Sequence, residues 1–218
     1  MDDDVIWLRP EQSAVGRPAR HTRAAITDAA VRIGDEHGLA AVTMRSVASA
    51  LGTAAGSLYR HVTGRDELVD LMVDHVAGEY DLQPSTGAWL DDLAQLAEQG
   101  LAIHRRHPWL GDIVTTPVPG PHGLALTERW LASLADHPAP DSDKLVAFAV
   151  TNALLGAFAR TGYGTDAARA RTQAAYLGRV AARGGYPRLA ALRPEGPTDP
   201  EQVFPEVLRR TLRGLLDS

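Results

Sequence analysis

The sequence predicts an all-α protein in two parts, and three observations support this prediction. Apolar residues recur at the three- and four-residue spacing of amphipathic helices through most of the chain. No segment shows the strict alternation that is typical of a half-buried strand. Clusters of proline and glycine divide the helical patterns. We expect an N-terminal arm over residues 1–19, a small helical domain over 20–65 and a larger helical domain over 66–218.

The small domain contains two short helical patterns broken at Gly52. A first helix is expected from an N-cap at Thr22 to Gly38, and Thr43 is expected to cap the second. The apolar positions of the second and third helices are Met44, Val47, Ala48 and Leu51, then Leu58 and Val62. This pattern is typical of a helix-turn-helix, whose recognition helix lies in the major groove of DNA. The recognition helix here would be the third helix of the domain, and its exposed residues are expected to be Ser57, Tyr59, Arg60 and His61.

The same residues resemble the DNA-binding head of the TetR family of bacterial transcription regulators. The resemblance spans about residues 20–79 and is carried by Gly38-Leu39, Ala48 with Leu51-Gly52, and Leu58–Val62 running into 65–68. The sequence departs from the family at Thr53, where the family usually has Val or Ile, and in the small residues 54–56. Abundant alanine, with Lys144 as the single lysine, suggests an actinobacterial source.

The resemblance implies roles for individual residues of the DNA-facing side. Tyr59 is expected to contact a phosphate and His61 to lie near the backbone, although both could be packing residues. Arg60 could read a guanine through O6 and N7 or could bind a phosphate instead. Thr43 could contact DNA as well as cap its helix.

Four more arginines and one serine complete the DNA-facing set that we expect. The resemblance places Arg45 near DNA and Arg65 against a phosphate at the start of the fourth helix, where Thr63 and Asp66 suggest a capping box. Ser57 belongs to the exposed face of the third helix. Arg17 and Arg20 lie in an arm that could enter a minor groove or could be a plain linker.

Charge is distributed unevenly along a chain whose net charge is −5. Residues 17–65 hold seven arginines and three acidic residues, a net charge of +4, whereas residues 66–218 carry −6. A basic head on an acidic body suits a protein that docks on DNA phosphates by one end.

The larger domain is expected to be a helical body that binds a ligand and forms a homodimer, as the resemblance implies. Helices are expected near 68–80, 89–106, 109–114, 123–136, 142–163, 166–182 and 201–216. The segment 143–163 is apolar over more than one face, which suits a helix packed against both its own core and a partner.

Candidate ligand contacts are the aromatic and polar residues on segments that surround the cavity in the resembled family. They are His104, His107, Trp109, Trp130, Phe148, Asn152, Leu155 and Tyr163. Asn152 is the only asparagine and lies in the most apolar segment, so a buried amide there would need a partner, either a ligand or a structural bond. Trp109 and Trp130 could equally be core residues.

Other classes of function find little support in the sequence. His104 and His107 share a helix face, but Pro108 follows and no cysteine or acidic ligand lies at a suitable spacing, so no metal and no cofactor are expected. No nucleophile elbow, phosphate loop or zinc-protease motif is present, and Asp91 and Asp92 point to different helix faces, so an enzyme is not expected. No charged start with a long apolar stretch suggests secretion or a membrane, and a cytoplasmic protein is expected.

The function predicted from these observations is sequence-specific transcriptional regulation. We expect a homodimeric repressor that binds a palindromic operator on double-stranded DNA and leaves it when a small, largely apolar effector enters the body. The alternative is a DNA-binding regulator that is ligand-independent or depends on a corepressor. An enzyme fused to a helix-turn-helix is a more distant alternative.

Overall fold

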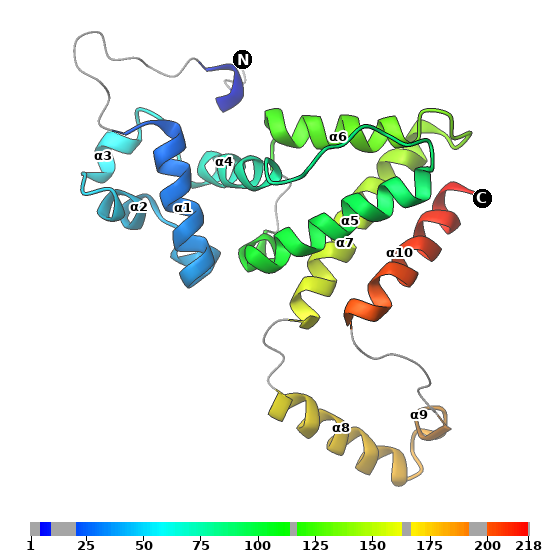
Figure 1. Ribbon diagram of the computed structural model, residues 1–218. Helices are drawn as coiled ribbons and strands as arrows, with labels where there is room; N and C mark the ends of the chain where they lie inside the picture. The colour runs from blue at the N-terminus through cyan, green and yellow to red at the C-terminus, as the bar shows by residue number, and fades with distance from the viewer. Residues whose placement is uncertain (1–4, 10–20, 114–116, 163–166, 192–199, 218) are drawn as a thin grey trace, which may run out of the picture.

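A computed structural model describes residues 5–9, 21–113, 117–162, 167–191 and 200–217, and every regular element in these ranges is helical. Figure 1 shows a small head of short helices beside a larger body of long ones, joined by α4. The all-α fold in two parts is therefore confirmed. Arg17, Arg20 and Tyr163 lie outside the described residues.

The head is built from α1 (Arg23–His37), η2 (Leu39–Ala41), α2 (Met44–Ala50) and α3 (Ala55–Leu58). Thr22 caps α1 by accepting a hydrogen bond from the Ala25 N–H, and Gly38 ends the helix at a φ of 80°. Both ends lie where the sequence predicts them. The apolar residues of these helices form one buried cluster that also includes Ile6 of the short η1 (Ile6–Leu8).

The helix α4 (Arg65–Ala77) contributes its buried face to the head cluster. Leu68, Leu71 and Met72 pack there, and the cluster continues into Ile103 and Trp109, which belong to the body in sequence. The hydrophobic core of the head therefore extends across α4 to the end of α5, so the two parts share a packed junction.

The body consists of α5 (Trp89–Arg106), η3 (Pro108–Asp112), α6 (Pro121–Ser133), α7 (Asp141–Gly162) and α10 (Pro200–Leu216). The second hydrophobic cluster lies among α5, α6, α7 and α10, with Leu93, Leu134, Leu155, Phe204 and Leu208 among its most buried residues. Residues 141–160 of α7 are long and apolar enough to cross a membrane by length and composition alone. In the structure α7 instead packs between α5 and α10 (Figure 1).

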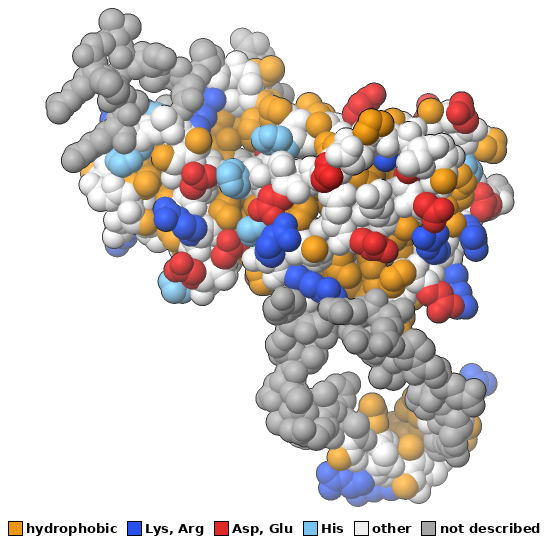
Figure 2. Space-filling model, viewed as in Figure 1, with side chains coloured by type: hydrophobic (Ala, Val, Ile, Leu, Met, Phe, Trp, Pro, Cys, Tyr) orange, Lys and Arg blue, Asp and Glu red, His pale blue; other side chains and the backbone are white. Residues whose placement is uncertain are grey.

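A hairpin of α8 (Ala167–Ala182) and α9 (Pro187–Ala191) stands away from the rest of the body (Figure 1). The helix α9 was missed because Gly184 and Pro187 were interpreted only as helix breakers, whereas Pro187 is the first residue of α9. Hydrophobic and arginine side chains both lie on the surface of this hairpin (Figure 2). Tyr176, Leu177, Tyr186 and Leu189 are its exposed large hydrophobic residues.

Candidate functional site

The helix-turn-helix has the local geometry that its sequence predicts. Thr43 and Ser46 form a capping box, in which the Thr43 hydroxyl accepts from the Ser46 N–H at 3.0 Å and the Ser46 hydroxyl accepts from the Thr43 N–H at 2.9 Å. Gly52 turns the chain at a φ of 62°, a conformation that favours glycine. Leu58 and Val62 are buried beneath α3, as expected. The short α3 is thus fixed from below by the head core.

The outer side of α2 and α3 presents several of the predicted DNA contacts together. Thr43 and Arg45 are exposed at the start of α2, and Tyr59 and Arg60 are exposed just after α3. Tyr59 is 54% exposed, so its side chain is accessible to a partner. This surface supplies two guanidinium groups and two hydroxyl groups, the donors that commonly bind phosphate and base edges.

Three other predicted DNA contacts also have local structural partners. The Ser57 hydroxyl donates to the Ala54 carbonyl at 2.7 Å, and the His61 carbonyl accepts from the Arg23 guanidinium at 3.4 Å. Arg65 donates to the carbonyls of Val42 and Leu39 at 3.2 and 3.0 Å, which ties the first turn of α4 to the loop before α2. These residues hold the helix-turn-helix together, whatever else they contact.

The predicted capping box of Thr63 and Asp66 at the start of α4 is wrong. The N-cap is Gly64, which has no side chain that could accept a hydrogen bond from the first N–H groups of α4. Glu67 takes the role expected of Asp66, because its carboxylate accepts from the Thr63 N–H at 2.7 Å. Glu67 also forms an ion pair with Arg9. Burial alone would raise the pKa of Glu67, but these hydrogen bonds and the Arg9 charge lower it.

The described part of the N-terminal arm joins the head to the body. Ile6 is buried in the head core, and the Trp7 indole donates to the carbonyl of Val118 at 3.1 Å, just before α6. Arg23 of α1 donates to the carbonyl of Arg9 at 2.8 Å. This segment braces α1 and α4 against the body.

Carboxylates on α4 hold the start of α6. Asp74 is nearly buried and accepts from the Gly123 N–H at 2.8 Å and from the His122 ring at 3.1 Å. Asp70 accepts from the Val118 N–H at 3.0 Å. Because Asp74 caps the N-terminus of α6 from a different helix, a movement of α6 is transmitted directly to α4.

His107 and Trp109 lie in this head–body junction, which corrects their prediction as ligand contacts. The His107 ring is buried between two carboxylates, with Nδ1 2.7 Å from Asp35 of α1 and Nε2 2.8 Å from Glu79. The Trp109 indole donates to the same Asp35 oxygen at 2.7 Å, and its ring packs against Gly34 of α1. Both side chains have partners on the head, so neither faces the body cavity.

Four of the predicted ligand contacts do line one cavity in the body. They are Trp130 of α6 and Phe148, Asn152 and Leu155 of α7. The cavity has a volume of about 10 Å³, and the rings of Trp130 and Phe148 meet edge to face with their centroids 5.3 Å apart. The sequence does not indicate the five other lining residues, namely Tyr80, Leu96, Ala97, Leu126 and Thr151. Helical spacing places Leu96, Leu126 and Thr151 in a core, but it cannot show where that core is hollow.

The argument that selected Asn152 is wrong, because its amide is exposed rather than buried. The amide donates to the Phe148 carbonyl of its own helix at 3.0 Å, at the edge of the cavity. Two other polar groups in the cavity wall are the ones without partners. The Trp130 Nε1 and Thr151 Oγ1 atoms are buried with no hydrogen-bond partner, and their residues are 2% and 3% exposed. Burial raises the pKa of the Tyr80 hydroxyl far above its usual range, so Tyr80 stays protonated.

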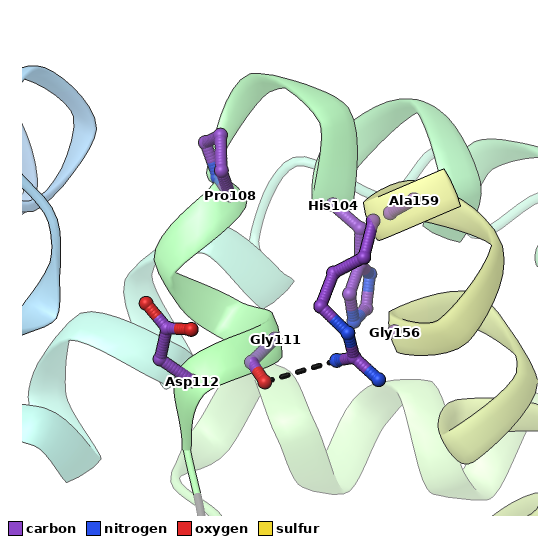
Figure 3. A pocket seen from close by; sticks show the side chains of 7 residues that line it. His104, Pro108, Gly111, Asp112, Gly156 and Ala159 are labelled. Carbon is purple, nitrogen blue, oxygen red and sulfur yellow. Dashed lines mark hydrogen bonds between the residues drawn. The ribbon is translucent and has the colours of Figure 1, made fainter. Parts of the chain in front are cut away.

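His104 lies in a separate, larger cleft between α5, η3 and the end of α7. Arg160 also lines this cleft, and its guanidinium donates to the Gly111 carbonyl at 3.0 Å, the bond drawn as a dashed line in Figure 3. Burial lowers the pKa of His104, although its bond to the Gly100 carbonyl opposes the shift. His104 and His107 therefore face different surroundings, and the described residues contain no cluster of three or more His or acidic side chains suited to a metal.

The paired carboxylates at the start of α5 have structural partners, and they point apart as predicted. Asp91 is exposed and pairs with Arg209 of α10 at 2.8 Å. Asp92 is buried and accepts from Ser85 and Thr86 in the loop before α5. Burial tends to raise the pKa of Asp92, but these hydrogen bonds and Arg129 lower it.

Comparison with known proteins shows matches along nearly the whole chain. A family model described as bacterial regulatory proteins, tetR family, matches residues 26–72, and one for the tetracyclin repressor-like C-terminal domain matches residues 83–218. The HTH-type transcriptional repressor DrrR1 of Streptomyces coeruleorubidus is 33% identical over 87% of this chain and 75% of its own. An HTH-type transcriptional regulator of Saccharopolyspora erythraea is 33% identical over 85% of this chain and 80% of its own.

Solved structures of Streptomyces coelicolor ActR have the same arrangement of helices. The structure of ActR in complex with actinorhodin superposes with a TM-score of 0.78, at 29% identity, and covers 90% of this chain and 97% of ActR. ActR in complex with (S)-DNPA gives the same TM-score and identity over 91% and 98% of the two chains.

Proposed function

The chain belongs to the TetR family of transcriptional regulators, and from this premise we propose that it is a homodimeric repressor whose operator is released when an effector fills the body cavity. The observation that carries the proposal is the connection between the two sites. The cavity residues Trp130 and Tyr80 lie on or beside the segments that hold α4, which in turn carries the head.

Two routes lead from the cavity to α4. Trp130 is on α6, whose first turn is held by Asp74 of α4. Tyr80 directly follows Glu79, which accepts from His107 and Arg106 at the end of α5. A ligand that pushes Tyr80 and Trp130 apart therefore moves both the segment that directly follows α4 and the helix that Asp74 bonds to α4.

A dimer gives such a movement its effect on DNA. Two heads must fit half-sites about one helical turn apart, roughly 34 Å, so a shift of a few ångströms in one α4 prevents both heads from docking together. The apolar surface for a partner is present on α7, where Leu145 and Val146 are exposed, and on the α8–α9 hairpin. The actinorhodin complex of ActR supports a small-molecule effector for a protein of this architecture. As a DNA-binding regulator, the protein works in the cytoplasm.

On the DNA, Tyr59 and Arg45 would bind phosphates and Arg60 would read a base. Tyr59 and Arg60 are both exposed directly after α3, between the buried residues Leu58 and Val62, which fix this turn on the head core. Thr43, Ser57, His61 and Arg65 would complete the contacts along the backbone. Arg17 and Arg20 would add charge from the arm.

The test begins with a binding site selected from a random duplex library. We expect a palindromic site, bound by two chains, with an affinity that falls steeply as salt is raised. Tyr59→Phe should weaken binding to all sequences by about 1 kcal/mol, since it removes one hydroxyl donor. Arg60→Ala should instead relax the preference at one base pair per half-site by about 1 to 3 kcal/mol.

A control variant separates DNA contact from folding. Arg213→Ala removes an exposed arginine of α10, outside both the head and the surface proposed for the partner, and should leave operator affinity and salt dependence unchanged. If Tyr59→Phe and Arg60→Ala also leave both unchanged, this surface does not bind DNA. If the wild-type chain selects no sequence at all, the proposed function fails.

A further inference from the structure

We infer that the effector of the body cavity is an uncharged, largely apolar molecule that presents a carbonyl oxygen to the Trp130 indole and the Thr151 hydroxyl. The inference rests on the proposed function, because it assumes that the cavity is the effector site, and it adds the chemical class of the effector. Three properties of the cavity wall lead to it.

The first property is a pair of buried polar atoms without partners. Trp130 Nε1 and Thr151 Oγ1 are both buried, both belong to residues that line the cavity, and neither has a hydrogen-bond partner. A buried polar group without a partner costs about 1 to 3 kcal/mol, so native proteins rarely keep two in the wall of one cavity. An indole N–H can only donate, which requires an acceptor on the ligand. A carbonyl oxygen has two lone pairs and can accept from the indole and the hydroxyl together.

The second property is the absence of charge among the residues that line the cavity. These lining residues are aliphatic, aromatic or neutral polar side chains. Tyr80 cannot supply a charge, since burial keeps its hydroxyl protonated. A carboxylate or an ammonium group would lose its hydration here without gaining an ionic partner, which is far more costly than burying a carbonyl. The effector should therefore be neutral.

The third property is the size and shape of the space. A volume of about 10 Å³ is about enough for one water molecule and far below the usual range for ligands, so a one- or two-ring molecule enters only when the wall moves. The rings of Trp130 and Phe148 form an aromatic wall, against which a flat ring packs well. The wall is tight at Tyr80 and Leu155, because a side chain at position 100 would clash with both residues and only glycine fits there.

The cleft at His104 differs from the cavity in each of these properties. It is larger, with a volume of about 330 Å³, it contains Arg160, and its polar side chains His104 and Arg160 already bond to backbone carbonyls. A charged ligand would therefore prefer the cleft, and a neutral ketone the cavity. This difference allows one set of probes to distinguish the two sites.

The experiment uses three probes that share one ring system: 1-indanone, indane and indane-1-carboxylate. Their affinities for the full-length protein are measured by calorimetry without DNA, and the indole N–H signals of its four tryptophans are followed by NMR. Trp130→Phe assigns the Trp130 signal and removes the donor, and Thr151→Val removes the hydroxyl. Trp89→Phe is the matched control, because Trp89 packs against His137 at the far end of α5 from the junction.

We expect 1-indanone to bind at least about tenfold more tightly than indane, which corresponds to one good hydrogen bond. Its binding should shift the Trp130 N–H signal downfield and leave the other three indole signals in place. Trp130→Phe should abolish the preference for the ketone, Thr151→Val should reduce it, and Trp89→Phe should retain it. The carboxylate should not bind in the cavity.

Equal affinity for the ketone and the hydrocarbon would overturn the inference, as would a ketone preference that survives Trp130→Phe, a preference for the carboxylate, or no binding of the ketone. None of these results depends on DNA. Operator selection, by contrast, tests the proposed function without any ligand, so the two can fail separately.

Discussion

Trp109 and Trp130 are both almost fully buried, yet their indole groups are in opposite situations. The Trp109 N–H donates to Asp35 in the junction between head and body, where His107 binds the same carboxylate. The Trp130 N–H in the body cavity has no partner. The same side chain thus serves as a structural bond in one core and remains an open donor in the other. The comparison teaches that the satisfaction of a buried polar group, more than its burial, separates a structural residue from a ligand contact.

The largest expected effect is the loss of His107 from the junction. His107→Leu would leave Asp35 and Glu79 facing an apolar side chain, with only Trp109 and Arg106 as remaining partners. Because the His107 ring is buried and would lose hydrogen bonds to two charged groups, we expect a loss of about 3 kcal/mol in the free energy of unfolding, measured by urea denaturation. His122→Leu is the control, since His122 is exposed while it bonds to Asp74, and it should cost less than about 1 kcal/mol. A similar loss in both variants would mean that the junction has no special role in stability.

The two tryptophans themselves give the second test. Trp109→Phe removes a donor from Asp35 and should lower the free energy of unfolding by about 1 to 3 kcal/mol more than Trp130→Phe does, since Trp130 has no bond to lose. Both changes remove similar apolar area, so the difference isolates the hydrogen bond. Thermal or urea unfolding without ligand measures it. Equal losses would show that the Trp130 N–H is already satisfied in solution, for example by water.

A smaller effect is expected from pH, through Glu79. Burial alone would raise the pKa of this carboxyl, but the hydrogen bonds and charges of Arg106 and His107 outweigh it and lower the pKa below its usual 4.5. A lowered pKa in the folded state gives stability that is fully present above pH 4.5 and is lost as the pH falls through the lowered value. Glu79→Gln should therefore be less stable than wild type at pH 6 to 7, by up to about 1 kcal/mol, and the difference should shrink on acidification. A constant difference from pH 7 to pH 3 would contradict this.

The sequence allowed the architecture and the DNA-facing surface to be predicted more fully than the ligand site. Helical spacing, the caps at Thr22 and Thr43 and the turn at Gly52 are local features, and the structure has all of them. The cavity depends on which helix faces meet, and α7 is apolar on more than one side. Asn152 was therefore assigned to the interior although it lies on the surface, whereas its neighbour Thr151 is the buried polar residue. Likewise, only the fold brings His107 and Trp109 beside Asp35, more than seventy positions earlier.

The smallest expected change in the free energy of unfolding is that of Thr151→Val, which tests whether the polar groups of the cavity wall have partners in the absence of a ligand. Thr151→Val replaces a hydroxyl by a methyl group of nearly the same size in a site where the hydroxyl has no partner. A satisfied buried hydroxyl would cost about 1 kcal/mol to remove, whereas an unsatisfied one costs nothing to remove or even gains stability. We therefore expect the free energy of unfolding without ligand to be unchanged within about 0.5 kcal/mol, or slightly raised. Thr27→Val is the matched control, because the buried Thr27 hydroxyl donates to the Arg23 carbonyl at 2.9 Å, and this variant should lose stability. If Thr151→Val loses as much as Thr27→Val, the hydroxyl has a partner in the ligand-free protein, and the cavity wall is closed rather than open to a ligand.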